Sequence, residues 1–296
     1  MIRVVITGAN GFIGKHLSIF LDNLEYDVYC IVRERSCLNG LEIDDSKIYK
    51  LKDNSDVFDY MNIIKPDILI HLAGYFVSQH DENNIENLLN SNIVYSSMIL
   101  DAAVKSGCKS IINCTTYWEH YMGQLYYPVN LYAATKKAFK DIIDYYVLWK
   151  NIDCISLVIF DTYGPNDNRP KILNKLHELP EGHIFKMSAG NQKMSLCYIE
   201  DVCEAFERAI EYVLDIRNKY PKVHKEFALK TPFIYTLKQV VDMFCRVTNK
   251  NIVVQWGALP YRTGEIMNPD AIGIDIPGWM AKVDLPEGIR RSFVDI

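Results

Sequence analysis

Three glycines follow the first apolar run of the chain at a spacing that few folds accommodate. The segment TGANGFIG, residues 7–14, places Gly8, Gly11 and Gly14 between the β-branched run IRVVIT and the start of a helical pattern. In such a turn, glycines permit the sharp bend, the close approach of a pyrophosphate and the packing of a helix on a strand. The amides at the helix start then face the phosphates. The sequence therefore predicts a dinucleotide-binding turn, with further contacts from Asn10, Phe12 and Ile13.

Continuous apolar runs alternate with longer helical patterns through the first half of the chain. Runs rich in β-branched residues and apolar on both faces are typical of parallel strands that helices cover on both sides. The sequence predicts an α/β fold with a Rossmann-type, doubly wound parallel sheet. The expected strands span residues 2–7, 27–32, 46–51, 67–72, 110–115 and 153–160, and the expected helices span residues 12–24, 55–64, 84–106 and 129–150.

The pattern changes after residue 163, where Pro and Gly become frequent, as in YGPNDNRP and GALPYRTG. Such segments are typical of loops. We expect a Rossmann domain that binds the dinucleotide at residues 1–163, to which part of 193–225 returns. The remaining residues, 164–296, would form a smaller, mainly substrate-binding region. Helical patterns continue in this half near residues 199–214, 236–248 and 286–294.

Composition excludes several classes of protein. The formal charge of −5 and the pI near 5.8 argue against a nucleic-acid partner, which would normally require a basic face. The eight cysteines include no CxxC pair and no His at zinc-ligand spacing, so we expect reduced thiols and no metal site. No apolar run approaches the ~20 residues that span a bilayer, and no signal-peptide pattern follows Met1. We therefore expect a cytoplasmic protein without a membrane partner.

The end of the second expected strand distinguishes the two nicotinamide cofactors. NAD-binding turns commonly carry an Asp or Glu about twenty residues after the glycines, where it binds the ribose hydroxyls. Here Arg33 stands nineteen positions after Gly14. A guanidinium group suits the 2′-phosphate of NADP and offers no partner for a free diol. The sequence therefore favours NADP(H) over NAD, with an ordinary solvated charge as the other interpretation of Arg33.

A series of ordered motifs extends along nearly the whole chain. After the glycine turn come HLAG at residues 71–74, NCTTY at 113–117, YAATK at 132–136 and DTYGPND at 161–167. CYIEDVCEAF, LPYRTGEIM and PGWMAKVDLPEGIRRS follow. In these motifs the chain resembles the extended short-chain dehydrogenase/reductase family, whose NAD-dependent epimerase/dehydratase group acts on nucleotide sugars. The resemblance implies an NAD(P)-dependent oxidoreductase with a nucleotide-diphosphate sugar as its substrate.

The pattern Tyr-x-x-x-Lys occurs twice, at Tyr132–Lys136 and at Tyr146–Lys150, so spacing alone does not identify a catalytic pair. In the family this pair lies early in the helix that follows the fifth strand, which selects Tyr132 and Lys136. The resemblance implies that Tyr132 is the general acid or base. Lys136 would bond the nicotinamide ribose, and its charge would favour ionisation of Tyr132.

The resemblance also assigns residues around this pair. Alignment of the strand end makes Thr116 the hydroxyl that holds the substrate oxygen, with Thr115 as the alternative. His71 is expected to pack and hydrogen-bond beneath the cofactor rather than to titrate. Asp53 resembles the acidic position near the adenine, although it also suits a plain turn. Further cofactor contacts are implied at Leu72, Ala73, Gly74, Tyr163 and Pro165.

Substrate contacts are implied in the second half of the chain. Arg262 matches the family position that binds the substrate diphosphate, and a bidentate guanidinium suits that role. Arg169 and Lys193 are further candidates, with solvated surface charge as the other interpretation of both. Val158 and Asp161 replace an arginine and an asparagine of the family pattern, which puts the function of those two positions in doubt.

Departures from the family pattern narrow the reaction. A 4,6-dehydratase would carry Asp and Glu directly after the strand-end Thr, and here Tyr117 and Trp118 stand there. The interpretation is therefore an NADPH-dependent 4-ketoreductase of CDP- or dTDP-linked 4-keto-6-deoxyhexoses, in the synthesis of deoxysugars for surface polysaccharide such as O-antigen. A nucleotide-sugar 4-epimerase with tightly bound NAD is the first alternative, and a non-catalytic NADP-binding sensor the second. The family also implies a homodimer through the helices at 84–106 and 129–150.

Overall fold

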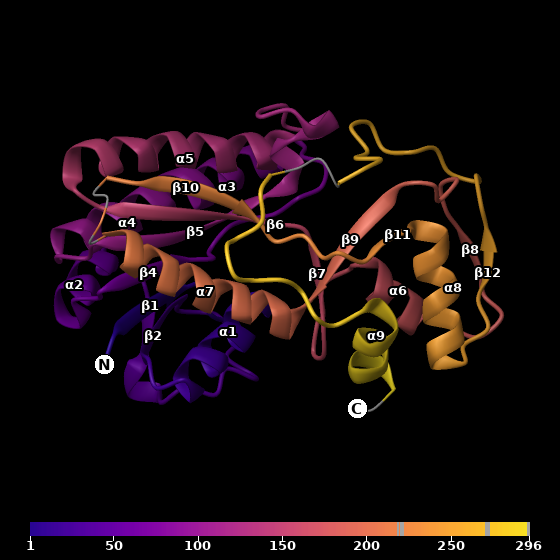
Figure 1. Ribbon diagram of the computed structural model, residues 1–296, viewed down its shortest axis with the longest axis horizontal. Helices are drawn as coiled ribbons and strands as arrows, with labels where there is room; N and C mark the ends of the chain where they lie inside the picture. Colours follow the sequence, from indigo (N-terminus) through magenta and orange to yellow (C-terminus); the bar gives the residue numbers. More distant parts are fainter. Residues whose placement is uncertain (218, 220–221, 270–272, 295–296) are drawn as a thin grey trace.

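The computed structural model describes residues 1–217, 219, 222–269 and 273–294 (Figure 1). Its main sheet contains β1 (Arg3–Thr7), β2 (Asp27–Arg33), β3 (Ile48–Leu51), β4 (Ile68–His71), β5 (Ser110–Thr116), β6 (Asp153–Ile159) and β10 (His224–Ala228). These strands are parallel and lie in the order β10-β6-β5-β4-β1-β2-β3. The order reverses between β1 and β4, as in a doubly wound nucleotide-binding sheet. The predicted fold class is confirmed.

Helices cover both faces of the sheet (Figure 1). Alternate residues of a strand point to opposite faces, so Val4 and Val5 of β1 belong to two different cores. Because both faces are buried, these strands have continuous apolar sequences instead of an alternating pattern. One core includes α1 (Phe12–Asn23) and α7 (Ile199–Arg217), and the other includes α2 (Asp56–Ile64), α4 (Ser96–Lys105) and α5 (Leu131–Lys150).

The helix expected at residues 84–106 is interrupted. It consists of α3 (Glu82–Leu89), a π-helical turn η2 (Asn90–Tyr95) and then α4. π-helical turns are rare inside α-helices and are frequent at functional sites. The apolar pattern continues through the turn, so the sequence carries no local sign of it.

The second half of the chain lies mainly beyond the carboxyl ends of the main strands (Figure 1). The expected helices at 199–214, 236–248 and 286–294 correspond to α7, α8 (Leu237–Thr248) and α9 (Leu285–Phe293). The other elements are α6 (Ile172–Glu178), the sheet of β7 (Asp161–Tyr163), β9 (Lys193–Tyr198) and β11 (Ile234–Thr236), the pair β8 (Ile184–Lys186) and β12 (Val253–Gln255), and the 3-10 turns η1 (Asp45–Lys47), η3 (Tyr117–Glu119) and η4 (Tyr121–Gly123).

The core that includes α1 and α7 also joins the two halves, since Leu17 of α1, Phe206 of α7 and Phe244 of α8 belong to the same buried cluster. The division at residue 163 stays a prediction, and within the returning segment 193–225 residues 218, 220 and 221 lie outside the described residues. None of the helices in the described part of the chain has the combined length and apolarity that crossing a membrane requires.

Candidate active site

The glycine turn packs against the loop that follows β4. Gly8 has a φ of +70°, and a Cβ added to it would lie 2.7 Å from the backbone nitrogen of Ala73. A Cβ on Gly14 would lie 2.3 Å from the carbonyl oxygen of Gly8. Gly11 is the N-cap of α1, and among the described residues no side chain caps this helix start. The amides of the first turn, which begins at Phe12, are therefore suited to bind an anion.

Arg33 is the last residue of β2, and Asp53 follows shortly after β3. These are the two outermost strands at one side of the sheet. β2 lies next to β1, and the Arg33 side chain is exposed, with Nη2 3.4 Å from Ser91 Oγ of the π-helical turn. Asp53 accepts hydrogen bonds from the amide and the hydroxyl of Ser55, at 2.8 and 2.6 Å. The Asp53 carboxylate thus stabilises the turn before α2, as the alternative interpretation expected.

Tyr132 and Lys136 lie in the first two turns of α5. The helix begins at Asn130, whose side chain accepts a 2.9 Å hydrogen bond from the amide of Ala133. Lys136 is 5% exposed, and a Cβ on Gly74 would lie 3.3 Å from its Nζ. The pair therefore faces the loop after β4, which is the loop that packs against the glycine turn.

Burial controls the ionisation of Tyr132. It raises the pKa of the phenol well above its ordinary value, and the nearby Cys114 and Glu119 raise it further. The sequence predicted that Lys136 would lower this pKa, whereas the pKa is raised, with burial as the largest cause. At neutral pH Tyr132 is therefore protonated, the state in which it can donate a proton.

In the second Tyr-x-x-x-Lys pair, the tyrosine connects two helices. The Tyr146 hydroxyl donates a 3.0 Å hydrogen bond to Asp101 of α4, and Lys150 Nζ lies 5.9 Å from the centre of the Tyr145 ring. Tyr146 follows Tyr132 by fourteen residues, or about 21 Å along a helix. Tyr146 therefore stabilises the contact between α4 and α5 and is too distant to share a reaction centre with Tyr132.

The two strand-end threonines point in opposite directions. The Thr115 hydroxyl is fully buried and lies 3.5 Å from the carbonyl oxygen of Leu157 in the neighbouring strand. Thr116 caps η3, where its hydroxyl accepts a 3.3 Å hydrogen bond from the amide of Trp118. Cys114 lies on the same strand face as Thr116. The sequence argument missed Cys114, although its position two residues before Thr116 is a signal for it.

His71 is neutral and buried at the end of β4. Its Nδ1 lies 2.8 Å from Thr7 Oγ1, and its Nε2 lies 2.9 Å from Ser96 Oγ. Burial, followed by the charge of Lys136, lowers the pKa of His71 to about 3. The expectation that His71 packs instead of titrating is confirmed.

Tyr163 and Pro165 lie in different surroundings. Tyr163 is 2% exposed, and its hydroxyl lies 3.5 Å from the carbonyl oxygen of Asp284, which caps α9. The carbonyl of Pro165 accepts a 3.1 Å hydrogen bond from His16 Nε2 of α1. Pro165 is therefore close to the helix of the glycine turn, whereas the Tyr163 side chain packs toward α9.

The three cations expected to contact substrate have separate partners. Arg262 binds Glu265 through Nε at 2.9 Å and Nη2 at 3.1 Å, and its guanidinium lies 5.3 Å from the centre of the Trp118 ring. Arg169 binds Asp167, and its guanidinium lies 4.3 Å from the centre of the Phe12 ring. The Arg169 side chain is thus paired and stacked, and its contact with substrate stays a prediction. Lys193 is exposed at the start of β9, where its backbone amide donates a 3.0 Å hydrogen bond to the carbonyl oxygen of Met267.

An aromatic wall that the sequence argument missed adjoins Tyr132. The Phe76 ring meets the Tyr132 ring edge-on at 5.0 Å and the Trp118 ring at 5.5 Å. Lys171 Nζ lies 5.7 Å from the centre of the Phe76 ring and 2.8 Å from Asp161 Oδ1. Asp161, which replaces the family asparagine, therefore binds a lysine beside this wall. Phe76 and Trp118 lie in loops from different parts of the chain, so no local pattern brings them together.

The π-helical turn contributes another missed residue, Asn92, which is 1% exposed. Its Oδ1 accepts a 2.7 Å hydrogen bond from the amide of Tyr75, and its Nδ2 donates to the carbonyl of Tyr75 and to Thr135 Oγ1, both at 3.0 Å. Asn92 thus connects the loop after β4 to the helix that carries Tyr132. Asn90 and Ser91 precede Asn92 directly, so no local pattern distinguishes Asn92 from its polar neighbours.

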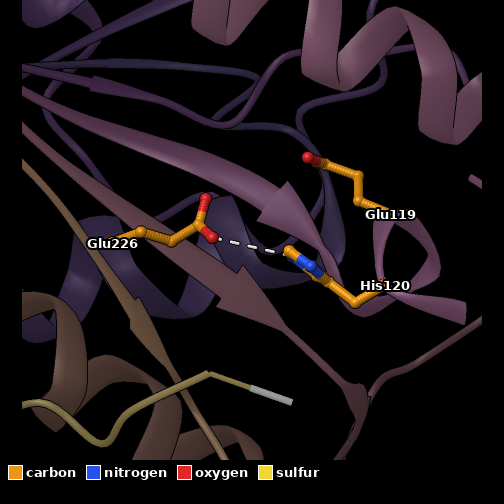
Figure 2. A group of neighbouring side chains, drawn as sticks. All are labelled: Glu119, His120 and Glu226. Atoms are coloured by element: carbon orange, nitrogen blue, oxygen red, sulfur yellow. Dashed lines mark ion pairs between the residues drawn. The ribbon is translucent and has the colours of Figure 1, made fainter. Parts of the chain in front are cut away.

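A buried ionic cluster lies beside α5. Figure 2 shows Glu119 and His120, which follow β5, and Glu226 of β10 on the opposite side. One ligand atom from each of the three lies within 4.8 Å of the others, a spacing that suits a cation. Lys140 of α5 supplies that charge, with its Nζ 2.7 Å from Glu119 Oε2 and 2.5 Å from Glu226 Oε2. The ammonium group thereby attaches the turn after Thr116 to the helix of Tyr132.

Two relatives match this chain along nearly its whole length. The chain is 29% identical over 271 residues to the CDP-abequose synthase of Yersinia pseudotuberculosis, across 90% of this chain and 92% of that protein. It is 24% identical over 297 residues to the CDP-abequose synthase of Salmonella typhimurium, across 97% of this chain and 96% of that protein.

Solved structures share the fold. The UDP-glucose 4-epimerase of Thermus thermophilus, in complex with NAD, matches with a TM-score of 0.78 at 19% identity, across 99% of this chain and 98% of that one. The UDP-glucose-4-epimerase of Stenotrophomonas maltophila, with bound NAD, matches with a TM-score of 0.83 at 17% identity, across 99% and 97%. The model of the NAD dependent epimerase/dehydratase family matches residues 4–220. The chain belongs to this family and is an NAD(P)-dependent enzyme of the extended short-chain dehydrogenase/reductase type.

Proposed function

We propose that this protein catalyses the NADPH-dependent reduction of a nucleotide-linked 4-keto-6-deoxyhexose, with CDP or dTDP as the carrier. The relatives named CDP-abequose synthase support a nucleotide-sugar substrate because they match the chain along almost its whole length. The observation that carries the choice of a reductase is Arg33, which occupies the end of β2, next to the strand of the glycine turn. A cation there favours NADPH, which exchanges between turnovers and supports net reduction.

In the proposed reaction Tyr132 acts as the general acid. A bound NADPH supplies a hydride to C4 of the sugar, and the C4 oxygen must then gain a proton. Tyr132 is suited to give it, because burial raises the pKa of its phenol and keeps it protonated at neutral pH. The Thr116 hydroxyl is the group proposed to hold the same oxygen, since the Thr115 hydroxyl lies toward Leu157 inside the sheet.

Lys136 and the glycine turn are proposed to position the cofactor. The Lys136 ammonium lies beside Gly74, where it can bond the nicotinamide ribose. The amides that start α1 suit the pyrophosphate, and the backbone of Leu72 and Ala73 completes the cradle. Arg33 is proposed to bind the 2′-phosphate. The cofactor contacts of Asp53, Tyr163 and Pro165 stay predictions.

Arg262 is the residue proposed to bind the substrate diphosphate, through Nη1, since its Nε and Nη2 hold Glu265. We also propose a homodimer through the helices at 84–106, which comprise α3, η2 and α4, and at 129–150, which is α5. Large apolar side chains are exposed on these elements, among them Leu89 at 40%, Val94 at 47% and Leu148 at 56%. Exposed apolar patches of this kind are typical of protein interfaces.

A nucleotide-sugar 4-epimerase with retained NAD is the second candidate. It is favoured by the solved structures with the same fold, which include UDP-glucose 4-epimerases in complex with NAD. Tyr132 and Lys136 would serve either reaction.

The stoichiometry of NADPH oxidation to sugar conversion distinguishes the reductase from the epimerase. The purified protein is mixed with NADPH and CDP- or dTDP-4-keto-6-deoxyglucose, and oxidised cofactor and sugar product are both counted. One mole of NADPH oxidised per mole of sugar converted supports the reductase. Conversion between sugar isomers with no net change of the nicotinamide would support the epimerase.

A further inference from the structure

The two rings beside Tyr132 form an apolar surface at the position where a substrate must bind. Phe76 is 49% exposed and Trp118 is partly exposed, although both are large aromatic side chains. They lie in the loops that follow β4 and β5, so they approach the site from two neighbouring strands. Exposed aromatic side chains at a reaction centre are typical of a surface that a ligand covers.

Distance determines which part of a sugar reaches this surface. The oxygen at C4 must lie within roughly 3 Å of the Tyr132 hydroxyl for proton transfer. C6 is the substituent on C5, and it is two carbon–carbon bonds of about 1.5 Å each from C4. The group at C6 therefore stays near the Tyr132 ring. The Phe76 ring is 5.0 Å from the Tyr132 ring. The group at C6 is therefore close enough to contact Phe76 and Trp118.

The two cationic groups that lie over the rings, Arg262 and Lys171, already have partners. Arg262 lies over Trp118 and forms two hydrogen bonds with Glu265. Lys171 lies over Phe76 and binds Asp161. A hydroxyl group placed between the rings would compete with these ion pairs or stay without a hydrogen bond, which costs about 1–3 kcal/mol. A methyl group avoids this cost and gains apolar contact.

We propose that Phe76 and Trp118 form the subsite for the C6 methyl group and discriminate against sugars with a hydroxyl group at C6. The inference rests on the proposed function and names the residues that select its substrate class. An apolar pocket rejects an added hydroxyl group by up to roughly 100-fold. We expect a preference for the 6-deoxy sugar of about 10- to 100-fold.

Equilibrium binding tests this inference without turnover. CDP-6-deoxyglucose and CDP-glucose, which differ only in the hydroxyl group at C6, are titrated calorimetrically into the full-length protein saturated with NADP⁺. The wild-type protein is expected to prefer the 6-deoxy sugar. Phe76→Ala and Trp118→Ala are each expected to reduce the preference at least ~5-fold, mainly by weakening the 6-deoxy complex. Trp118→Phe, which keeps an aromatic ring, is expected to retain most of the preference.

Substitution of an exposed tryptophan outside the proposed subsite provides the control. Trp149 is 76% exposed near the end of α5, and Trp149→Ala is expected to leave the preference unchanged. Equal binding of the two sugars by the wild-type protein would overturn the subsite, as would an unchanged preference in both alanine variants. If neither CDP-sugar nor the dTDP-linked pair binds, the proposed function itself fails, and the subsite fails with it.

Discussion

The backbone of Ala73 lies so close to Gly8 that a Cβ on Gly8 would stand 2.7 Å from the Ala73 nitrogen. The turn after β1 and the loop after β4 therefore support each other, and the cofactor cradle depends on both. Gly8→Ala should raise the dissociation constant of NADPH at least ~10-fold, because the backbone must shift and the positive φ costs roughly 1–2 kcal/mol.

Gly107→Ala is the matched control for this change. Gly107 also has a positive φ, +99°, but a Cβ there would meet nothing within 4 Å. It should lose roughly 1–2 kcal/mol of stability from the positive φ alone and keep its affinity for NADPH, as measured by thermal unfolding and fluorescence titration. Equal losses of affinity in the two variants would show that the close contact with Ala73 is unimportant.

Arg33→Ala should weaken NADPH binding about 10- to 100-fold and leave NADH binding nearly unchanged. The reason is that a charge-assisted contact to phosphate contributes about 1.5–3 kcal/mol and only NADPH carries the 2′-phosphate. Arg35→Ala, a neighbouring exposed arginine, should have a smaller effect. Equal weakening of both cofactors in Arg33→Ala would instead indicate a general loss of the cradle and would contradict the assignment of Arg33 to the 2′-phosphate.

Lys140→Met should destabilise the protein by about 3–5 kcal/mol, since it leaves Glu119 and Glu226 side by side without their shared cation. Lys137 on the same helix forms an ion pair with Asp141 that is open to solvent, so Lys137→Met should cost less than ~1 kcal/mol. Urea unfolding of the two variants measures the difference. Similar small losses would mean that the cluster contributes little to the fold.

His224 predicts a pH dependence of stability. Its Nδ1 lies 2.6 Å from Asp144 Oδ1 and its Nε2 lies 2.8 Å from Ser156 Oγ. Ser156 is fully buried within the sheet, so this Ser-His-Asp chain is structural. Burial lowers the pKa of His224, but Cys154 and Asp144 outweigh it and raise the pKa from 6.5 to about 9.

A raised pKa stabilises the folded state while the imidazole is protonated. The contribution is complete below pH 6.5 and is lost as the pH rises to about 9. We expect His224→Gln to lose up to about 3 kcal/mol at the acidic end of this window and much less at the basic end. Unfolding free energies of both proteins across the window measure this, and a difference independent of pH would contradict the assignment.

Local sequence patterns were sufficient to predict most of the fold. The glycine turn and the runs that became β1, β2, β4, β5 and β6 carry their own signals, because both faces of each strand are buried. β10 was missed, since HKEFA is short and polar and lies at the edge of the sheet, where only part of it is covered. The π-helical turn was not predicted, because no characteristic amino-acid composition accompanies its hydrogen-bond pattern.

The candidate site was predictable only where a motif is continuous. Tyr132, Lys136 and the glycines stand in ordered segments, whereas Phe76 meets Trp118 through two separate loops. The direction of the Tyr163 side chain depends on α9, which is more than a hundred residues away in sequence. Contacts of this kind are decided by tertiary packing, which a local pattern does not contain.

The most direct test of the central claim is the loss of reduced-nicotinamide absorbance in Tyr132→Phe and Tyr146→Phe, with NADPH and CDP- or dTDP-4-keto-6-deoxyglucose. The account predicts that the wild-type protein and Tyr146→Phe consume NADPH at similar rates. Tyr132→Phe should be slower by roughly 10²–10⁴-fold, because it lacks the proton donor. Full activity in Tyr132→Phe, or loss of activity in Tyr146→Phe, would contradict the choice of catalytic pair. The absence of NADPH consumption by the wild-type protein, with sugar isomers still interconverting, would contradict the reductase itself.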